Sequence, residues 1–307
     1  GRHRCAGLQA NPPRAVSLRR EWFGEFSVLR RPARGENVVA VHFAHATGFN
    51  ANTYAPLLES LDPTIDVYAM DARGHGLSKA SANPKTLRTW KPYVRDLGTL
   101  VATIPRPTVL VGHSMGGTVS LELAAANPEW VAGVVLVDPV LPPPRVGWWL
   151  PVARAVGWTR RVPIARAAAK RTTEFSSKEA AVDNFEGKGA FRTWPREWIE
   201  AYVEGGTVAT ENGVRLSCDR AWESRTFAKA TPRSFAYVKR LRCPTTLIAR
   251  EGSGPPLPEE SCNAFMRARP DTRLVKLKGA SHFMTMERPD VVRDEIHRMV
   301  ETVRSKL

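Results

Sequence analysis

Short apolar runs that alternate with helical patterns constrain the fold of this chain more than any other feature. One strand is expected near residues 25–30, at the edge of the sheet and before the first of these apolar runs in the chain. The apolar runs occupy residues 38–43, 65–70, 108–113, 133–138, 245–250 and 273–278. Strands that alternate with helices are typical of βαβ units. The chain is therefore expected to be an α/β protein with a mostly parallel, twisted sheet flanked by helices.

The block at residues 141–242 interrupts this alternation. It opens with three prolines at 142–144, holds six of the nine tryptophans, and has nineteen Lys or Arg against ten acids. We expect a helical cap, or lid, inserted between two parts of a core at residues 25–140 and 243–307, after a basic leader at 1–24. The cap is either purely structural or, as we favour, shapes an apolar substrate pocket. The candidate pocket residues are Trp148, Trp149, Trp194 and Trp198.

The net charge of +15 bears on possible partners. The excess lies in the leader and in the block 141–242, and neither contains a recognition helix, an RNA-binding motif or a zinc-finger motif. We therefore expect no nucleic-acid partner and interpret the charge as a solvated basic surface. Weak contact with an anionic membrane is the alternative. Nothing in the sequence indicates an oligomeric state.

Mostly the absence of particular motifs limits the cellular location and the cofactors that can be expected for this chain. No apolar run reaches membrane-spanning length, and the leader lacks the apolar core of a signal peptide, so a soluble, cytoplasmic protein is expected. The final tripeptide, Ser305-Lys306-Leu307, matches a peroxisomal address and gives that alternative in a eukaryotic host. The four cysteines have neither C-x-x-C nor disulfide-like spacing, which favours reduced thiols and no metal site.

Residues 112–116, Gly-His-Ser-Met-Gly, match the pattern G-x-S-x-G. The motif follows an apolar run and opens a helical pattern, which is the context that gives it meaning. The glycines are needed because larger side chains two residues before and after the serine would collide in so sharp a turn. Such a turn lifts the hydroxyl of Ser114 above the sheet edge. It also places the amide of Met115 at a helix N-terminus, where a developing oxyanion is stabilised.

At this motif the chain resembles the serine hydrolases of the α/β-hydrolase fold, which include esterases and lipases. Residues 42–49, HFAHATGF, resemble the loop that supplies the second oxyanion amide, and Thr47 is the first candidate, with Ala46 next. Residues 71–78, DARGHGLS, resemble a structural turn of the family. Residues 279–289, GASHFMTMERP, resemble the loop with the catalytic histidine, so the resemblance implies His282 as the base.

The acid that should hold this histidine is not where the family usually carries it. A serine nucleophile needs a base, and the base needs an acid to fix its tautomer. The loop that usually carries the acid follows the run 245–250 and here reads Glu-Gly-Ser-Gly at 251–254. The position where the family has its aspartate is occupied by Gly254, or by Ser253 with a shift of one residue. Glu251 lies earlier than the usual position.

Asp138 is the favoured acid. It ends the run 133–138, 24 residues after Ser114, and some members of the fold carry their acid after that strand. The carboxyl ends of strands line the active-site crevice in such sheets, so the location is physically sound. Glu251 is the main alternative, and Glu259, Glu260 or the absence of an acid remain open.

The resemblance implies a serine hydrolase that cleaves a carboxylic ester, thioester or lactone with an apolar group, through an acyl-enzyme on Ser114. It implies no metal and no organic cofactor. Two alternatives stay open: a carbon–carbon or amide hydrolase of the same fold, and a ligand-binding or receptor protein with weak turnover. The lack of an acid would favour the second.

Overall fold

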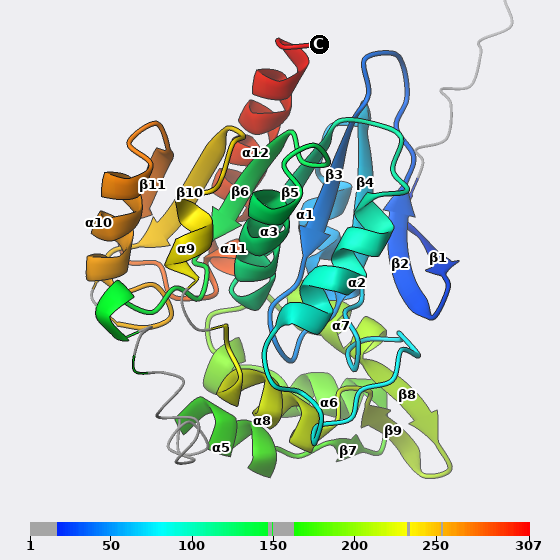
Figure 1. Ribbon diagram of the computed structural model, residues 1–307. Coiled ribbons are helices and arrows are strands. Elements are labelled where there is room, and N and C mark those ends of the chain that lie inside the picture. Colours follow the sequence, from blue (N-terminus) through cyan, green and yellow to red (C-terminus); the bar gives the residue numbers. More distant parts are fainter. Residues whose placement is uncertain (1–16, 147–148, 150–162, 232–233, 253) are drawn as a thin grey trace, which may run out of the picture.

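A mostly parallel sheet forms the centre of the protein. The computed structural model describes residues 17–146, 149, 163–231, 234–252 and 254–307. Eight strands follow the order β1-β2-β4-β3-β5-β6-β10-β11 (Figure 1). The β1–β2 and β2–β4 pairs are antiparallel and the others are parallel. The strands are β1 (Arg19–Phe23), β2 (Phe26–Arg31), β3 (Val39–Ala44), β4 (Ile65–Met70), β5 (Thr108–His113), β6 (Gly133–Val137), β10 (Thr245–Arg250) and β11 (Arg273–Leu277). The expected α/β class is confirmed.

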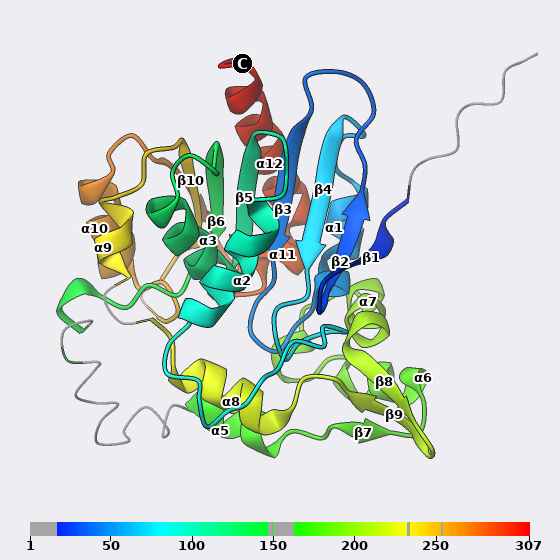
Figure 2. The same cartoon turned by 45° about the vertical axis from the view of Figure 1, so that its right-hand side comes forward.

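Helices cover both faces of this sheet, which is why its strands are apolar along their whole length. In β5, Val109 and Val111 face one hydrophobic core and Leu110 faces the other. Figures 1 and 2 show α2, α3 and α9 on one face and α1, α11 and α12 on the other. The core helices are α1 (Ala55–Glu59), α2 (Lys91–Val101), α3 (Met115–Ala126), α9 (Phe235–Val238), α10 (Glu259–Ala268), α11 (Met284–Glu287) and α12 (Pro289–Arg304), with the 3-10 turn η1 (Ala51–Tyr54).

The sheet begins earlier than the boundary expected at residue 25. Residues 19–23, placed in the basic leader from the sequence, form β1 and pair with β2. Gly24 has a φ of +55° and closes the tight turn between these strands. The strand expected at 25–30 is therefore second in the sheet, and β1 is the edge.

The cap is not purely helical. Its helices are α5 (Pro163–Lys170), α6 (Lys178–Phe185), α7 (Arg196–Gly206) and α8 (Arg220–Ala228), with the turn η3 (Gly189–Phe191). A small antiparallel sheet, β7 (Glu174–Phe175), β9 (Gly213–Leu216) and β8 (Thr207–Thr210), accompanies them. The β8–β9 hairpin was not predicted from the sequence; its two-residue loop is followed by Gly213 at a φ of +135°. The block 141–242 also includes α9, which packs on the core helices α3 and α10.

The cap lies across the carboxyl ends of the parallel strands (Figure 2). Hydrogen bonds fix it to the core: the amide group of Asn50 donates to the Tyr202 carbonyl at 2.9 Å, and the Trp222 indole donates to the Arg73 carbonyl at 3.1 Å. The cap therefore roofs the sheet edge where parallel α/β proteins hold their active sites.

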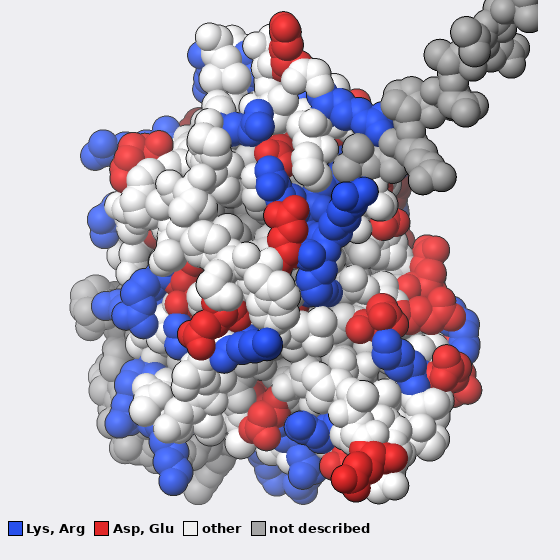
Figure 3. Space-filling model, turned by 90° about the vertical axis from the view of Figure 1, so that its right-hand side faces the viewer, with Lys and Arg blue, Asp and Glu red and all other residues white. Residues whose placement is uncertain are grey.

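Basic and acidic side chains are interspersed on the face formed by β1 and β2 (Figure 3). Arg20 lies 2.9 Å from Asp71, and Arg30 and Arg106 lie 3.8 and 3.2 Å from the buried Asp66. Part of the positive charge expected from the sequence is thus neutralised locally. Within the described ranges, no helix combines the length and apolar character needed to span a membrane.

Candidate active site

A strained turn presents Ser114 between β5 and α3. Ser114 has φ 56° and ψ −117°, a backbone conformation that residues other than glycine rarely adopt. The glycines on either side are sterically required. A Cβ on Gly112 would lie 2.3 Å from the Gly116 carbonyl oxygen, and one on Gly116 would lie 2.0 Å from the Ala44 carbonyl oxygen. The sequence pattern therefore forms the sharp turn that was expected.

Three side chains from distant parts of the chain form one hydrogen-bonded series. The Nε2 atom of His282 lies 3.0 Å from the Ser114 hydroxyl oxygen, and its Nδ1 atom lies 2.8 Å from Oδ2 of Asp138. The carboxylate accepts from Nδ1–H, which leaves Nε2 free to accept the serine proton. The structure thus brings together the serine, the histidine and the favoured acid.

The position of Asp138 follows from the order of the strands. In β5 and β6, which are neighbours, His113 pairs with Val137, so Ser114 and Asp138 leave the sheet side by side. Asp138 turns at a φ of +40°, is fully buried, and donates its backbone N–H to the Ile248 carbonyl at 2.8 Å. The loop with His282 follows β11, at the same end of the sheet.

The other acid candidates lie away from His282. Glu251 is exposed, and its backbone N–H donates to the Leu277 carbonyl. Glu260 pairs with Arg145 at 2.7 Å. Glu259 lies 3.9 Å from Lys276. Among the described residues, Asp138 is the carboxylate that contacts the histidine ring.

Arg250 occupies the space beside the loop that usually carries the acid. Its Nε atom lies 3.4 Å from Oδ2 of Asp138, and its guanidinium donates to the carbonyls of Gly254 and Pro255 at 2.5 Å each. Arg250 was not among the site residues predicted from the sequence. The feature that could have indicated it is its charge, since Arg250 ends the run 245–250, which is otherwise uncharged. This run forms β10, which pairs with β6.

The two candidate oxyanion residues are in contact. The Thr47 hydroxyl lies 3.3 Å from the Met115 sulfur. The amide of Ala46, the second candidate, donates to the Tyr54 hydroxyl at 3.2 Å and is therefore occupied. The amides of Thr47 and Met115 have no protein acceptor within the part of the chain that the structure describes. Unlike the Ala46 amide, these two therefore remain candidates to donate to a bound oxygen.

His113 links these loops behind the serine. The Tyr54 hydroxyl donates to Nδ1 of His113 at 2.8 Å, and Nε2–H of His113 donates to the His282 carbonyl at 2.8 Å. Together with the Ala46 contact, this series joins the oxyanion loop to the histidine loop. These contacts give His113 a structural hydrogen-bonding role.

Aromatic rings from the cap and the core meet beside the histidine. The ring centroids of Phe49 and Trp194 are 5.1 Å apart, those of Trp194 and Phe283 are 5.7 Å apart, and Phe283 lies 5.4 Å from His282. Apolar rings thus adjoin both the histidine and the oxyanion loop.

The four candidate pocket tryptophans do not share one environment. Trp194 belongs to the aromatic cluster beside His282. Trp198 is buried in the same hydrophobic core. Trp149 is 72% exposed and does not join this cluster. Trp148 lies outside the described residues.

No group of three or more His, Cys, Asp or Glu side chains in the described ranges is arranged to hold a metal ion. Cys218, Cys243 and Cys262 are buried free thiols, and Cys5 lies outside those ranges.

The sequence matches the model of the alpha/beta hydrolase family over residues 38–295. The chain belongs to this family. It is 25% identical over 260 residues to 2-(acetamidomethylene)succinate hydrolase of Mesorhizobium japonicum, covering 84% of this chain and 87% of the relative. It is also 25% identical over 268 residues to pimeloyl-[acyl-carrier protein] methyl ester esterase of Xanthomonas axonopodis pv. citri, covering 86% and 96%. The crystal structure of E-2-(acetamidomethylene)succinate hydrolase superposes with a TM-score of 0.73 at 24% identity, over 92% of this chain and 98% of the other. This hydrolase is thus similar to enzymes that act on different bonds.

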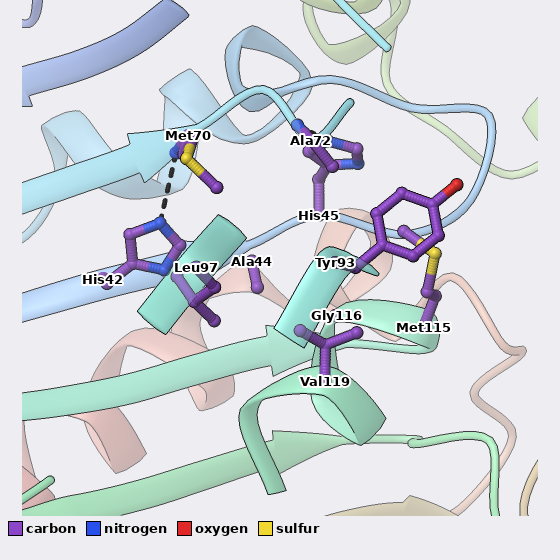
Figure 4. A pocket seen from close by; sticks show the side chains of 10 residues that line it. All are labelled: His42, Ala44, His45, Met70, Ala72, Tyr93, Leu97, Met115, Gly116 and Val119. Atoms are coloured by element: carbon purple, nitrogen blue, oxygen red, sulfur yellow. Dashed lines mark hydrogen bonds between the residues drawn. The ribbon is translucent and has the colours of Figure 1, made fainter. Parts of the chain in front are cut away.

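Buried histidines should make the protein sensitive to acid. His42 and His45 line a cavity of about 20 Å³ together with Met115 (Figure 4). Burial lowers the pKa of His42 and of His75 to about 3, and lowers the pKa of His113 well below its ordinary value. The unfolded chain therefore binds more protons than the native one between about pH 6.5 and pH 3. At pH 5 each such imidazole should reduce the free energy of unfolding by about 2 kcal/mol.

Urea unfolding at pH 7.5 and pH 5.0 tests this expectation. The free energy of unfolding should be several kcal/mol lower at the acidic pH, and the loss should be smaller in His75→Gln. Equal stability at the two pH values would contradict the neutral, buried state of these rings.

Arg250 should contribute to stability through its contact with the fully buried Asp138. We expect Arg250→Met to lower the free energy of unfolding by about 3 kcal/mol, because it leaves a buried carboxylate without its cation. The matched control is Arg145→Met, which removes a 78% exposed arginine from its pair with Glu260 and should change stability by less than about 1 kcal/mol. Urea unfolding of both variants measures the difference. Equal effects would show that the Arg250 contact is not stabilising.

Proposed function

We propose that this hydrolase cleaves carboxylic esters through an acyl-enzyme on Ser114. The observation that carries the proposal is the series Ser114–His282–Asp138, with contacts of 3.0 and 2.8 Å. In this arrangement a serine is hydrogen-bonded to a histidine, and a buried carboxylate holds the other ring nitrogen. Such an arrangement activates a hydroxyl near neutral pH. It favours turnover over a role in ligand binding alone.

The proposed reaction uses the groups already described. The Ser114 oxygen attacks the ester carbonyl while His282 Nε2 takes the hydroxyl proton. The amides of Met115 and Thr47 stabilise the oxyanion of the tetrahedral intermediate. His282 returns the proton to the leaving alcohol, and a water molecule then releases the acid by the same steps. Thioesters and lactones contain the same acyl group and are further candidates.

The aromatic cluster supports an apolar group on the substrate. Trp194, from the cap, contacts both Phe49 of the oxyanion loop and Phe283, which adjoins the ring of His282. A pocket lined by such rings binds apolar groups by removing them from water. The methyl ester esterase among the relatives is consistent with ester cleavage.

Pre-steady-state kinetics with p-nitrophenyl esters test the proposal. We expect a burst of p-nitrophenol close to one equivalent per active site, followed by slower turnover, since acylation and deacylation are separate steps. Octanoate should give a higher kcat/KM than acetate because it occupies the apolar wall. The absence of any turnover that depends on Ser114 would exclude the proposal.

A second candidate is amide hydrolysis. It is favoured by the similarity to 2-(acetamidomethylene)succinate hydrolase, whose named substrate contains an acetamido group. p-Nitroacetanilide, the amide counterpart of p-nitrophenyl acetate, separates the two. A kcat/KM for the ester at least about 100-fold above that for the amide supports the ester proposal, and the reverse order supports the second candidate.

A further inference from the structure

A groove of about 520 Å³ is lined by residues of α2, α3 and α9. These helices cover one face of the sheet (Figure 1). Its volume is in the range of small-molecule sites. It is distinct from the candidate active site, because none of the residues that line it belongs to the Ser114–His282–Asp138 series. The proposed esterase activity gives it no role.

One oxygen of a buried carboxyl group that lines the groove has no hydrogen-bond partner among the described residues. Glu122, in the middle of α3, is 2% exposed, and its Oε1 atom has no partner among the described residues. Burial raises the pKa of this carboxyl to about 7, although the Thr231 hydroxyl and the Lys91 ammonium act to lower it. A buried acceptor that is left unpaired destabilises the fold, so its presence in a groove points to a ligand that supplies the donor.

The rim of the groove carries the opposite charge. Lys91 and Arg95 are exposed, lie one turn apart on α2, and both line the groove. Apolar and aromatic side chains also line the groove, among them Leu123, Trp130 and Tyr237. Trp130 is 36% exposed, which is unusual for a ring that large and apolar.

Charge complementarity selects the class of ligand. A simple anion would be repelled by Glu122, and a simple cation would be repelled by Lys91 and Arg95. A neutral apolar molecule would leave the carboxylate unpaired. A molecule with an ammonium and a carboxylate on the same carbon, and an apolar group beside them, satisfies all three surfaces.

We infer that this groove binds a free α-amino acid with a large apolar side chain. The ammonium donates to the Glu122 carboxylate, and the ligand carboxylate accepts from Lys91 and Arg95. The side chain packs along Leu123, Trp130 and Tyr237. The site is independent of the proposed ester cleavage and does not require it.

The site should respond to pH between 6 and 8. The groups that face Glu122 are Lys91 and Arg95 from α2, Tyr237 from α9, and the Thr231 hydroxyl. Lys, Arg and Tyr side chains keep their charge state in this range, so the Glu122 carboxyl is the group that changes. Because the ammonium requires the ionised carboxylate, affinity should rise about tenfold from pH 6 to pH 8.

Titration calorimetry of the full chain with L-phenylalanine tests the inference. We expect saturable binding that is stronger at pH 8 than at pH 6. Phenethylamine, which lacks the carboxylate, and 3-phenylpropionate, which lacks the ammonium, should each bind at least about tenfold more weakly. Equal binding of either analogue would overturn the zwitterion assignment.

Three variants locate the binding. Glu122→Gln should weaken binding about tenfold and remove its pH dependence, and the exposed Glu129→Gln, outside the groove, should change neither. Ala126→Trp fills the groove from an exposed position and should abolish binding. The p-nitrophenyl ester activity of all three should remain that of the unmodified chain, which verifies folding. No saturable binding, or binding unaffected by both Glu122→Gln and Ala126→Trp, would refute the site.

Discussion

Replacing Ser114 with alanine is expected to reduce kcat for a p-nitrophenyl ester by about 10⁴- to 10⁶-fold. The hydroxyl oxygen is 3.0 Å from His282 and is the proposed attacking atom, so no acyl-enzyme can form without it. Residual hydrolysis would come from the oxyanion donors acting on bound substrate. Steady-state kinetics with the octanoate ester measure the loss.

The control for this variant is Ser120→Ala, which changes a buried serine within α3 that lies outside the hydrogen-bonded series. It should keep kcat within a few fold. Substantial activity in Ser114→Ala would show that another group is the nucleophile, and equal loss in both variants would indicate damage to α3.

The second large effect concerns the acid. Asp138→Asn keeps the shape of the side chain but removes the carboxylate that accepts from His282 Nδ1 at 2.8 Å. The imidazole is then no longer held in the tautomer with the proton on Nδ1, and the imidazolium has no negative partner. We expect kcat to fall about 10⁴-fold. The pH-rate profile and thermal unfolding should be measured alongside, since Asp138 also faces Arg250.

Glu251→Gln is the matched comparison, because it removes one carboxylate from the loop that usually carries the acid. Glu251 is exposed, and among the described residues it has no contact with His282, so kcat should stay within about twofold. Equal, mild losses in the two variants would overturn the assignment of Asp138. A large loss in Glu251→Gln alone would move the acid to this loop.

The residues of the candidate site were predictable from the sequence to different extents. The turn at 112–116 was predictable because only glycine fits at two of its positions. A Cβ on Gly112 or Gly116 would lie within 2.3 Å of a carbonyl oxygen. The histidine loop was assigned through family resemblance, and Ser114 and His282 prove to be in contact. The β8–β9 hairpin and the strand Arg19–Phe23 were missed, because short edge strands leave weak periodic signals.

Arg250 and the Glu122 groove lay beyond sequence reasoning. An arginine at a strand end and a glutamate within an apolar helix look ordinary in the chain. Their roles depend on what lies opposite them: the buried Asp138 in one case, and the basic edge of α2 in the other. Side-chain partners of this kind come from packing between elements, which local spacing does not encode.

The sequence by itself determined the α/β class, the sharp turn at Ser114 and a short set of possible acids, because strand periodicity and glycine sterics act over a few residues. Only the tertiary structure shows which of these acids contacts the histidine. His282 and Asp138 are 144 positions apart in the chain, and their 2.8 Å contact exists because β6 lies beside β5 and β10 lies between β6 and β11. The order of strands in a sheet depends on how whole elements pack together, so local spacing could not show that the end of β6, and not the loop after β10, brings a carboxylate to His282.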